Sequence, residues 1–138
     1  MATRQQTAPQ IPFDPAAEAD RLFEIFNGLS NSLDEFLISA NLPPAESAPV
    51  QAHSRKLEDM AHHFTAVSMA ATLRAIQPQL DGIKTVTAEA KEQLNHLNDV
   101  AKVIAIAQAA VNVGAAIAEA NPAAILGAAE GLAHTLAV

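Results

Sequence analysis

The chain has 138 residues and a net charge of −7, which comes from eight basic and fifteen acidic side chains. A chain of this length forms one domain with a real hydrophobic core. Half of its residues are hydrophobic, too many for a disordered protein. The acidic balance disfavours binding to nucleic acid or, by charge, to anionic lipid. Cysteine is absent, which excludes disulfides and thiol chemistry.

The first segment, residues 1–11, is polar and carries only one charged side chain, Arg4. It lacks the apolar core of a secretory signal. We therefore expect residues 1–13 to form a flexible polar tail and residues 14–138 to form a single helical-bundle domain. For the same reason we expect the protein to be cytoplasmic or secreted by a signal-independent route.

A stripe of apolar residues, spaced alternately by three and four positions, predicts a first helix over about 14–40. Asp14 is a suitable N-cap for it, and Pro15 suits the first helical position. The segment from Asn41 to Pro44 predicts its end. The stripe consists of Ala19, Leu22, Phe26, Leu29, Leu33, Phe36 and Ala40.

A second helix is predicted to start near Ala48-Pro49 and to continue to about Ile76, again because apolar residues alternate by three and four. Pro78 and Gly82 then lie close together, which favours a turn between helices. The apolar rhythm nevertheless continues through them without a change of phase, as a proline-kinked continuous helix requires. Both interpretations, the turn and the kink, remain open on the sequence alone.

A third helix is predicted from about Ile83 to Ala120, amphipathic at first and apolar nearly all round from Val100 onward. Asn121-Pro122 then predicts a turn, because a residue before proline is pushed out of the α region. Asn is also a good N-cap, and Pro suits the first position of a new helix. The sequence therefore predicts an apolar, alanine-rich hairpin over 100–138, whose second arm spans about 122–137.

The resulting fold class is all-α: a bundle of three long helices plus a short C-terminal helix that completes the apolar hairpin. At about 1.5 Å per residue, the third helix would be roughly 57 Å long and the first roughly 40 Å. The far part of the third helix should then lack a partner on some sides. We expect uncovered apolar surface there, and such surface marks interaction sites.

Small residues at four-residue spacing occur on both arms of the predicted hairpin, around Gly114 on the first arm and at Gly127 and Gly131 on the second. Rows of this kind form grooves that let two helix backbones approach closely. We therefore predict a tight contact between the arms, and an interaction region made by the hairpin. Its residues are Val103, Ile104, Val111, Gly114, Ile117, Ile125, Gly127, Gly131, Leu132 and Leu136.

Histidines near carboxylates are the only candidates for catalysis or metal binding. Two groups occur, Glu58, Asp59, His62 and His63 in the second helix, and Glu92, His96 and Asp99 in the third. Neither reproduces the Glu-x-x-His pattern of di-iron bundles, so solvated helix pairs explain them better. Nucleophile and phosphate-binding motifs are absent from the sequence. We expect a non-enzymatic protein with no metal and no cofactor.

Two functions fit these features. The first is a helical assembly or interaction module that buries its apolar stripes and its C-terminal hairpin against itself or a protein partner. The second is a conditionally membrane-inserting protein that uses the 100–138 hairpin. The valines and isoleucines of the first arm favour insertion by about −2 to −4 kcal/mol, and Gln108 and Asn112 oppose it. Long amphipathic helices beside an apolar hairpin are broadly similar to α-helical pore-forming toxins, in architecture and not in any motif.

Overall fold

The computed structural model describes residues 14–64, 66–119 and 121–137. Within these ranges the chain forms six α-helices and a short 3-10 helix, with no strand, which confirms the all-α prediction. The elements are α1 (Pro15–Ala40), α2 (Pro44–His63), α3 (Ala66–Ala75), η1 (Gln77–Gln79), α4 (Leu80–Leu94), α5 (Val100–Ala118) and α6 (Pro122–Ala137). The predicted tail, residues 1–13, and the predicted end of the third helix at Ala120 lie outside the described residues.

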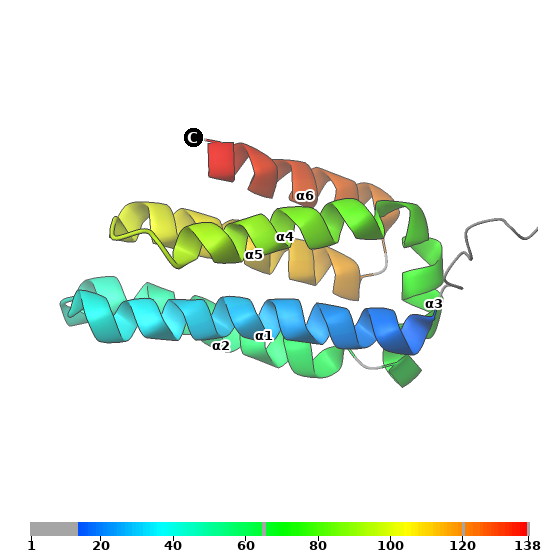
Figure 1. Ribbon diagram of the computed structural model, residues 1–138, viewed down its shortest axis with the longest axis horizontal. Coiled ribbons are helices and arrows are strands. Elements are labelled where there is room, and N and C mark those ends of the chain that lie inside the picture. Colours follow the sequence, from blue (N-terminus) through cyan, green and yellow to red (C-terminus); the bar gives the residue numbers. More distant parts are fainter. Residues whose placement is uncertain (1–13, 65, 120, 138) are drawn as a thin grey trace, which may run out of the picture.

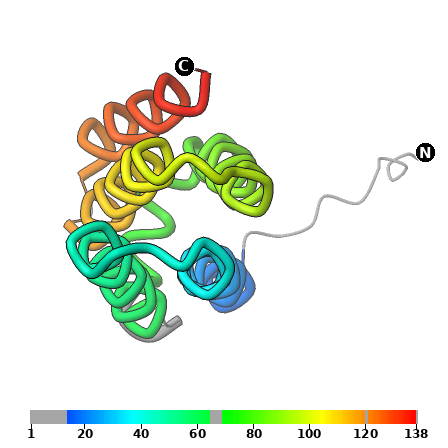
Figure 2. Tube along the Cα trace, turned by 90° about the vertical axis from the view of Figure 1, so that its left-hand side faces the viewer, coloured from blue at the N-terminus to red at the C-terminus, as the bar shows by residue number. Residues whose placement is uncertain are grey.

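The long helices run back and forth along one axis in stacked layers (Figure 1). The pair α1 and α2 forms one layer, and α4 and α5 form the next, with α1 against α4 and α2 against α5. Helix α6 lies on α4 and α5, on the side away from the first pair (Figure 2). The short α3 crosses one end of the bundle and packs against α1. Helix α5 thus has neighbours on several sides.

Both ends of α1 are fixed by the residues that the sequence indicated. The Asp14 carboxylate accepts a hydrogen bond from Ala16 N at 3.0 Å, and Pro15 occupies the first helical position. Asn41 ends the helix in the left-handed conformation, with φ 55°, which Asn tolerates better than most residues. The predicted first helix is therefore confirmed.

The second predicted helix is wrong in both its start and its continuity. Helix α2 begins at Pro44 rather than near Pro49, since a proline loses no hydrogen bond at the first helical position. The helix then ends before Phe64, whose ψ of 70° is not helical. The Phe64 side chain is nevertheless buried, 5.2 Å from the ring of Phe26 in an edge-to-face contact. The apolar spacing therefore continues through Phe64, because its side chain is in the core although its backbone is not helical.

At residues 76–80 the structure has the predicted turn and not the kinked helix. Helix α3 ends at Ala75, the 3-10 helix η1 carries Pro78, and α4 begins at Leu80. Figure 1 shows α3 across the end of the bundle and α4 along it. Ile76 and Leu80 are both buried, which explains why the apolar rhythm continues through the turn.

The predicted continuous third helix is also wrong. It breaks after Leu94, and α5 begins at Val100, capped by Asp99, whose carboxylate accepts from Ala101 N at 3.1 Å. Helix α5 therefore folds back along α4 instead of extending beyond it (Figure 1). The expected overhang of uncovered apolar residues does not exist. Of its residues, Ile104 is half-buried, and the others are buried: Val103, Ile106, Val111, Val113 and Ile117.

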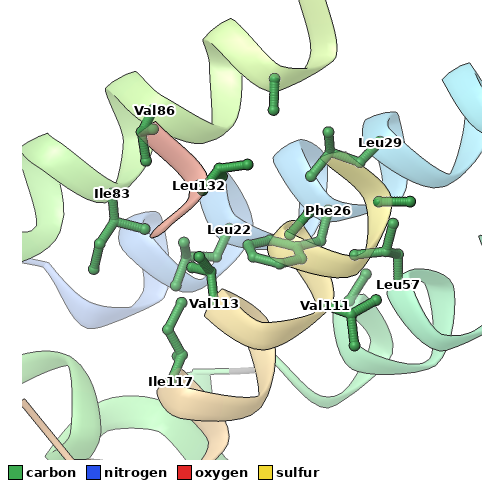
Figure 3. Close-up of a cluster of buried hydrophobic side chains, with 14 of the residues drawn as sticks. Leu22, Phe26, Leu29, Leu57, Ile83, Val86, Val111, Val113, Ile117 and Leu132 are labelled. Atoms are coloured by element: carbon green, nitrogen blue, oxygen red, sulfur yellow. The ribbon is translucent and has the colours of Figure 1, made fainter. Parts of the chain in front are cut away.

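The core lies between the layers and receives side chains from every long helix (Figure 3). Phe26 of α1 lies among them and is fully buried. The surrounding residues labelled in Figure 3 are Leu22, Leu29, Leu57, Ile83, Val86, Val111, Val113, Ile117 and Leu132. The chain therefore buries its most apolar segment, α5, in its own interior.

Candidate functional site

The predicted interaction residues separate into two groups in the structure. Gly127 and Gly131 are exposed on α6, whereas Ile104 is half-buried. The others are buried, and they are Val103, Val111, Gly114, Ile117, Ile125, Leu132 and Leu136. Of the predicted interaction residues, only Gly127 and Gly131 are exposed in this conformation.

The two arms pack against each other, but the prediction that their rows of small residues make this contact is wrong. A Cβ atom added to Gly114 would clash with Met60 Sδ and lie 3.0 Å from Phe26 Cε2. The close approach of α5 is therefore to α1 and α2. At Gly127 and Gly131 an added Cβ would meet no atom within 4 Å. Helix α6 turns its larger apolar side chains toward the bundle, which places its row of glycines on the outside.

The exposed side of α6, here called the α6 outer surface, carries very little charge. Glu130 is its one carboxylate, and Leu126 is half exposed. The surface consists of Ala123, Leu126, Gly127, Glu130, Gly131, Ala133, His134 and Ala137. By contrast, the exposed sides of α1 and α2 carry many ionised groups, among them Asp20, Arg21, Glu24, Asp34, Glu35, Arg55, Lys56, Glu58 and Asp59. The α6 outer surface is therefore weakly charged and consists mostly of small residues.

Side chains from elsewhere hold α6 at both ends. The Asn121 carboxamide accepts from Ala123 N at 3.1 Å and from Ala124 N at 3.3 Å, as its position as N-cap predicts. At the other end, Lys102 Nζ donates to Thr135 O at 2.5 Å and Gln93 Nε2 donates to Leu136 O at 3.1 Å. These carbonyls have no partner within the helix itself. No sequence pattern pointed to Gln93, because its partner lies far along the chain.

The histidines of the two candidate groups bond mainly within their own helices. His62 Nδ1 donates to Glu58 O at 2.9 Å, and His63 Nδ1 to Asp59 O at 2.7 Å. His96 Nε2 donates to Glu92 Oε1 at 3.2 Å across an exposed helical turn. In the part of the chain that the structure describes, no three His, Asp or Glu side chains converge as metal ligands would. The absence of a bound metal stays a prediction.

Buried serines between α1 and α2 are a feature that sequence reasoning missed. Ser54 Oγ donates to Asp34 Oδ1 at 2.7 Å and accepts from Ser30 Oγ at 2.8 Å. The structure uses their small size to bring two helices close, and their hydroxyls satisfy each other.

His53 on α2 is half-buried, and its Nδ1 is buried with no hydrogen-bond partner among the described residues. Burial, followed by the nearby positive charge of Lys56, lowers the pKa of His53 below its ordinary value of 6.5. Protonation therefore costs more in the folded chain than in the unfolded chain.

The free energy of unfolding should consequently fall as the pH decreases through 6.5 toward the lowered pKa of His53. Above that pH range the imidazole is neutral in both the folded and the unfolded chain, so it does not change the free energy of unfolding. His53→Gln should lose less stability than the wild type between about pH 7.5 and pH 5.5, as measured by urea unfolding. Equal losses in both proteins would show that His53 does not contribute to this dependence.

Among the described residues, α5 is the single helix long and apolar enough to cross a membrane, with 19 residues and a mean hydropathy of 1.8. Core helices of soluble proteins have the same properties, and 56% of α5 is buried in the bundle. Its exposed polar residues pair with each other, since Gln108 Nε2 donates to Asn112 Oδ1 at 3.1 Å.

Comparison with known proteins gives no match: no protein-family model, no curated protein and no solved structure is significantly similar to this chain. Functional inference therefore rests on the surfaces of the molecule itself.

Proposed function

We propose that this protein is a non-enzymatic helical interaction module that associates, through the α6 outer surface, with a second copy of itself or with a protein partner. In this proposal α5 and α6 act as an apolar hairpin that is built onto the bundle. The observation that carries it is the weakly charged row of small residues around Gly127 and Gly131, which no described residue covers.

The α6 outer surface allows a second helix to approach closely. Ala123, Gly127 and Gly131 follow one another at four-residue spacing, so they form a shallow groove along α6. Alanine and glycine have no side-chain freedom to lose on association. Glu130 is the only carboxylate on this surface, so little charge must be desolvated. A contact between two copies would use the same surface twice, as twofold dimers do.

Light scattering of the full chain over a range of concentrations tests the self-association. We expect a species heavier than the 14.4 kDa monomer, and we expect Gly127→Arg to shift it to the monomer by placing a charge in the contact. Ala52→Arg is the matched control, because Ala52 is exposed on α2, in the other outer layer of the bundle. A wild type that stays monomeric at high concentration would refute self-association, and equal effects of both variants would refute the α6 outer surface as its site.

The second candidate is conditional membrane insertion of α5 and α6, which the length and hydropathy of α5 favour. The Gln108–Asn112 hydrogen bond lowers the cost of placing both amides in lipid. Insertion would require α5 to leave the core and Lys102 to release Thr135 O. We expect leakage of a trapped dye from neutral liposomes if this function holds.

Deletion of residues 122–138 separates the two candidates. If α6 is needed only to cover α4 and α5, the shortened protein should aggregate, because apolar side chains of these two helices lose cover. If α5 and α6 insert together, the deletion should abolish liposome leakage and leave a soluble helical domain. A full-length protein that causes no leakage at neutral or acidic pH would exclude insertion under those conditions.

A further inference from the structure

A groove runs between the start of α4 and the first half of α6, here called the α4–α6 groove. Its volume is about 350 Å³, which lies within the range of small-molecule sites. It is lined by Pro78, Gln79, Gly82, Ile83, Val86, Ile125, Leu126, Ala129, Glu130 and Ala133. The groove shares Leu126, Glu130 and Ala133 with the α6 outer surface, but its lining does not include Gly127 or Gly131.

The lining of the groove is mostly apolar. Ile83 and Ile125 are buried within it, and Leu126 remains half exposed. Leu126 is one of only two large hydrophobic residues exposed in the described part of the chain. An apolar body seated here would remove the Leu126 side chain from water, which is favourable.

One polar atom of the lining residues has no partner. Gln79 Oε1 is buried and accepts no hydrogen bond within the described residues. Buried acceptors are normally satisfied, and one that is not carries the full cost of its lost hydration. A bound molecule that donates a hydrogen bond to Gln79 Oε1 would remove this cost.

The charge of the groove indicates the same kind of molecule. Glu130 is its one ionisable lining residue, and no lysine, arginine or histidine lines it. The side chains of the groove therefore offer acceptors and a negative charge. A carboxylate or phosphate group would be repelled by Glu130 and could not satisfy Gln79 Oε1.

We propose that the α4–α6 groove binds a small apolar molecule whose single polar group donates a hydrogen bond, such as an alkyl alcohol or an alkylammonium. The apolar body packs on Ile83, Ile125 and Leu126, and the donor meets Gln79 Oε1. Gly82 keeps the groove open, since it has no side chain and no atom lies within 4 Å of where its Cβ would be.

Three probes with the same hexyl chain test the chemistry: hexanol, hexylammonium and hexanoate. Their binding to the full-length protein is followed by the shifts of backbone amide signals in NMR spectra. We expect hexanol and hexylammonium to shift signals of residues 79–86 and 125–133, and hexanoate to bind at least about tenfold more weakly. If hexylammonium binds and hexanol does not, the Glu130 charge dominates and the hydrogen bond to Gln79 is refuted. Absence of shifts in the groove, or equal binding of hexanoate, would overturn the proposal.

Two leucine variants test the location. Gly82→Leu fills the groove and should weaken hexanol binding at least about tenfold, whereas Ala52→Leu, on the exposed side of α2 and outside the lining, should leave the affinity unchanged. Gln79→Leu should weaken hexanol binding about fivefold through loss of the acceptor, and should also stabilise the free protein. Equal affinities of Gly82→Leu and the wild type would place the probe elsewhere and overturn the site. The association test uses Gly127→Arg and light scattering, so either proposal can fail alone.

Discussion

Phe26→Ala is expected to lower the free energy of unfolding by about 3–5 kcal/mol, the range for losing a buried phenylalanine from a core. The Phe26 side chain is fully buried, lies edge-to-face with Phe64 at 5.2 Å, and borders the position of Gly114. Its loss leaves a cavity between α1, α5 and the segment that follows α2. Since a domain of this kind has about 5–15 kcal/mol of total stability, the variant should lose a large share of it.

Urea unfolding followed by circular dichroism measures this loss. Phe23→Ala is the matched control, because Phe23 is only half-buried and lies edge-to-face with the exposed His62 at 5.5 Å. Phe23→Ala should lower the free energy of unfolding by much less than Phe26→Ala does. Comparable losses in the two variants would show that Phe26 is not at the centre of the packing.

Gly114→Leu is expected to destabilise the protein by about 1–3 kcal/mol or more, because it overpacks a filled core. Even the first carbon of the new side chain would clash with Met60 Sδ and press on Phe26. Met60 can move, since it is partly exposed, whereas Phe26 is fully enclosed. The added leucine therefore has to separate α5 from α1 and α2.

Gly127→Leu in α6 is the matched control for Gly114→Leu. The melting temperatures of the two variants are compared by thermal unfolding. No atom lies within 4 Å of the position where the Gly127 Cβ would be. Removing glycine from an exposed helix interior is favourable by up to about 1 kcal/mol, so Gly127→Leu should keep or slightly raise the melting temperature. A melting temperature of Gly127→Leu as low as that of Gly114→Leu would show that α6 packs its glycines inward.

The limits of sequence reasoning here have a specific physical cause. Apolar spacing reports which side of the backbone faces the core, and it says little about whether the backbone is continuous. Phe64, Leu94 and Leu97 keep the apolar rhythm while the helices break beside them. Both ends of α1 were predictable from the sequence. Asp14 and Pro15 at its start and Asn41 at its end are local signals that need no distant partner.

The candidate surface shows the same limitation. Four-residue spacing correctly places small residues on one side of each helix, but it does not say which side faces inward. That choice depends on the larger neighbours, and in α6 the side chains of Ile125, Leu132 and Leu136 decide it. The α4–α6 groove could not be predicted from the sequence for a similar reason. Gln79 and Glu130 are brought together only by the packing of α6 on α4.

The way in which α6 is held bears on how the molecule opens. Only three of its side chains are buried, and the side-chain hydrogen bonds to its ends come from Asn121, Lys102 and Gln93. Helices with few buried contacts detach at lower cost than the global unfolding of a domain. Helix α6 is synthesised after α4 and α5, so these two helices are uncovered in the growing chain until α6 has left the ribosome. A chaperone that binds nascent chains would therefore find its apolar target on the side of α4 and α5 that α6 later covers.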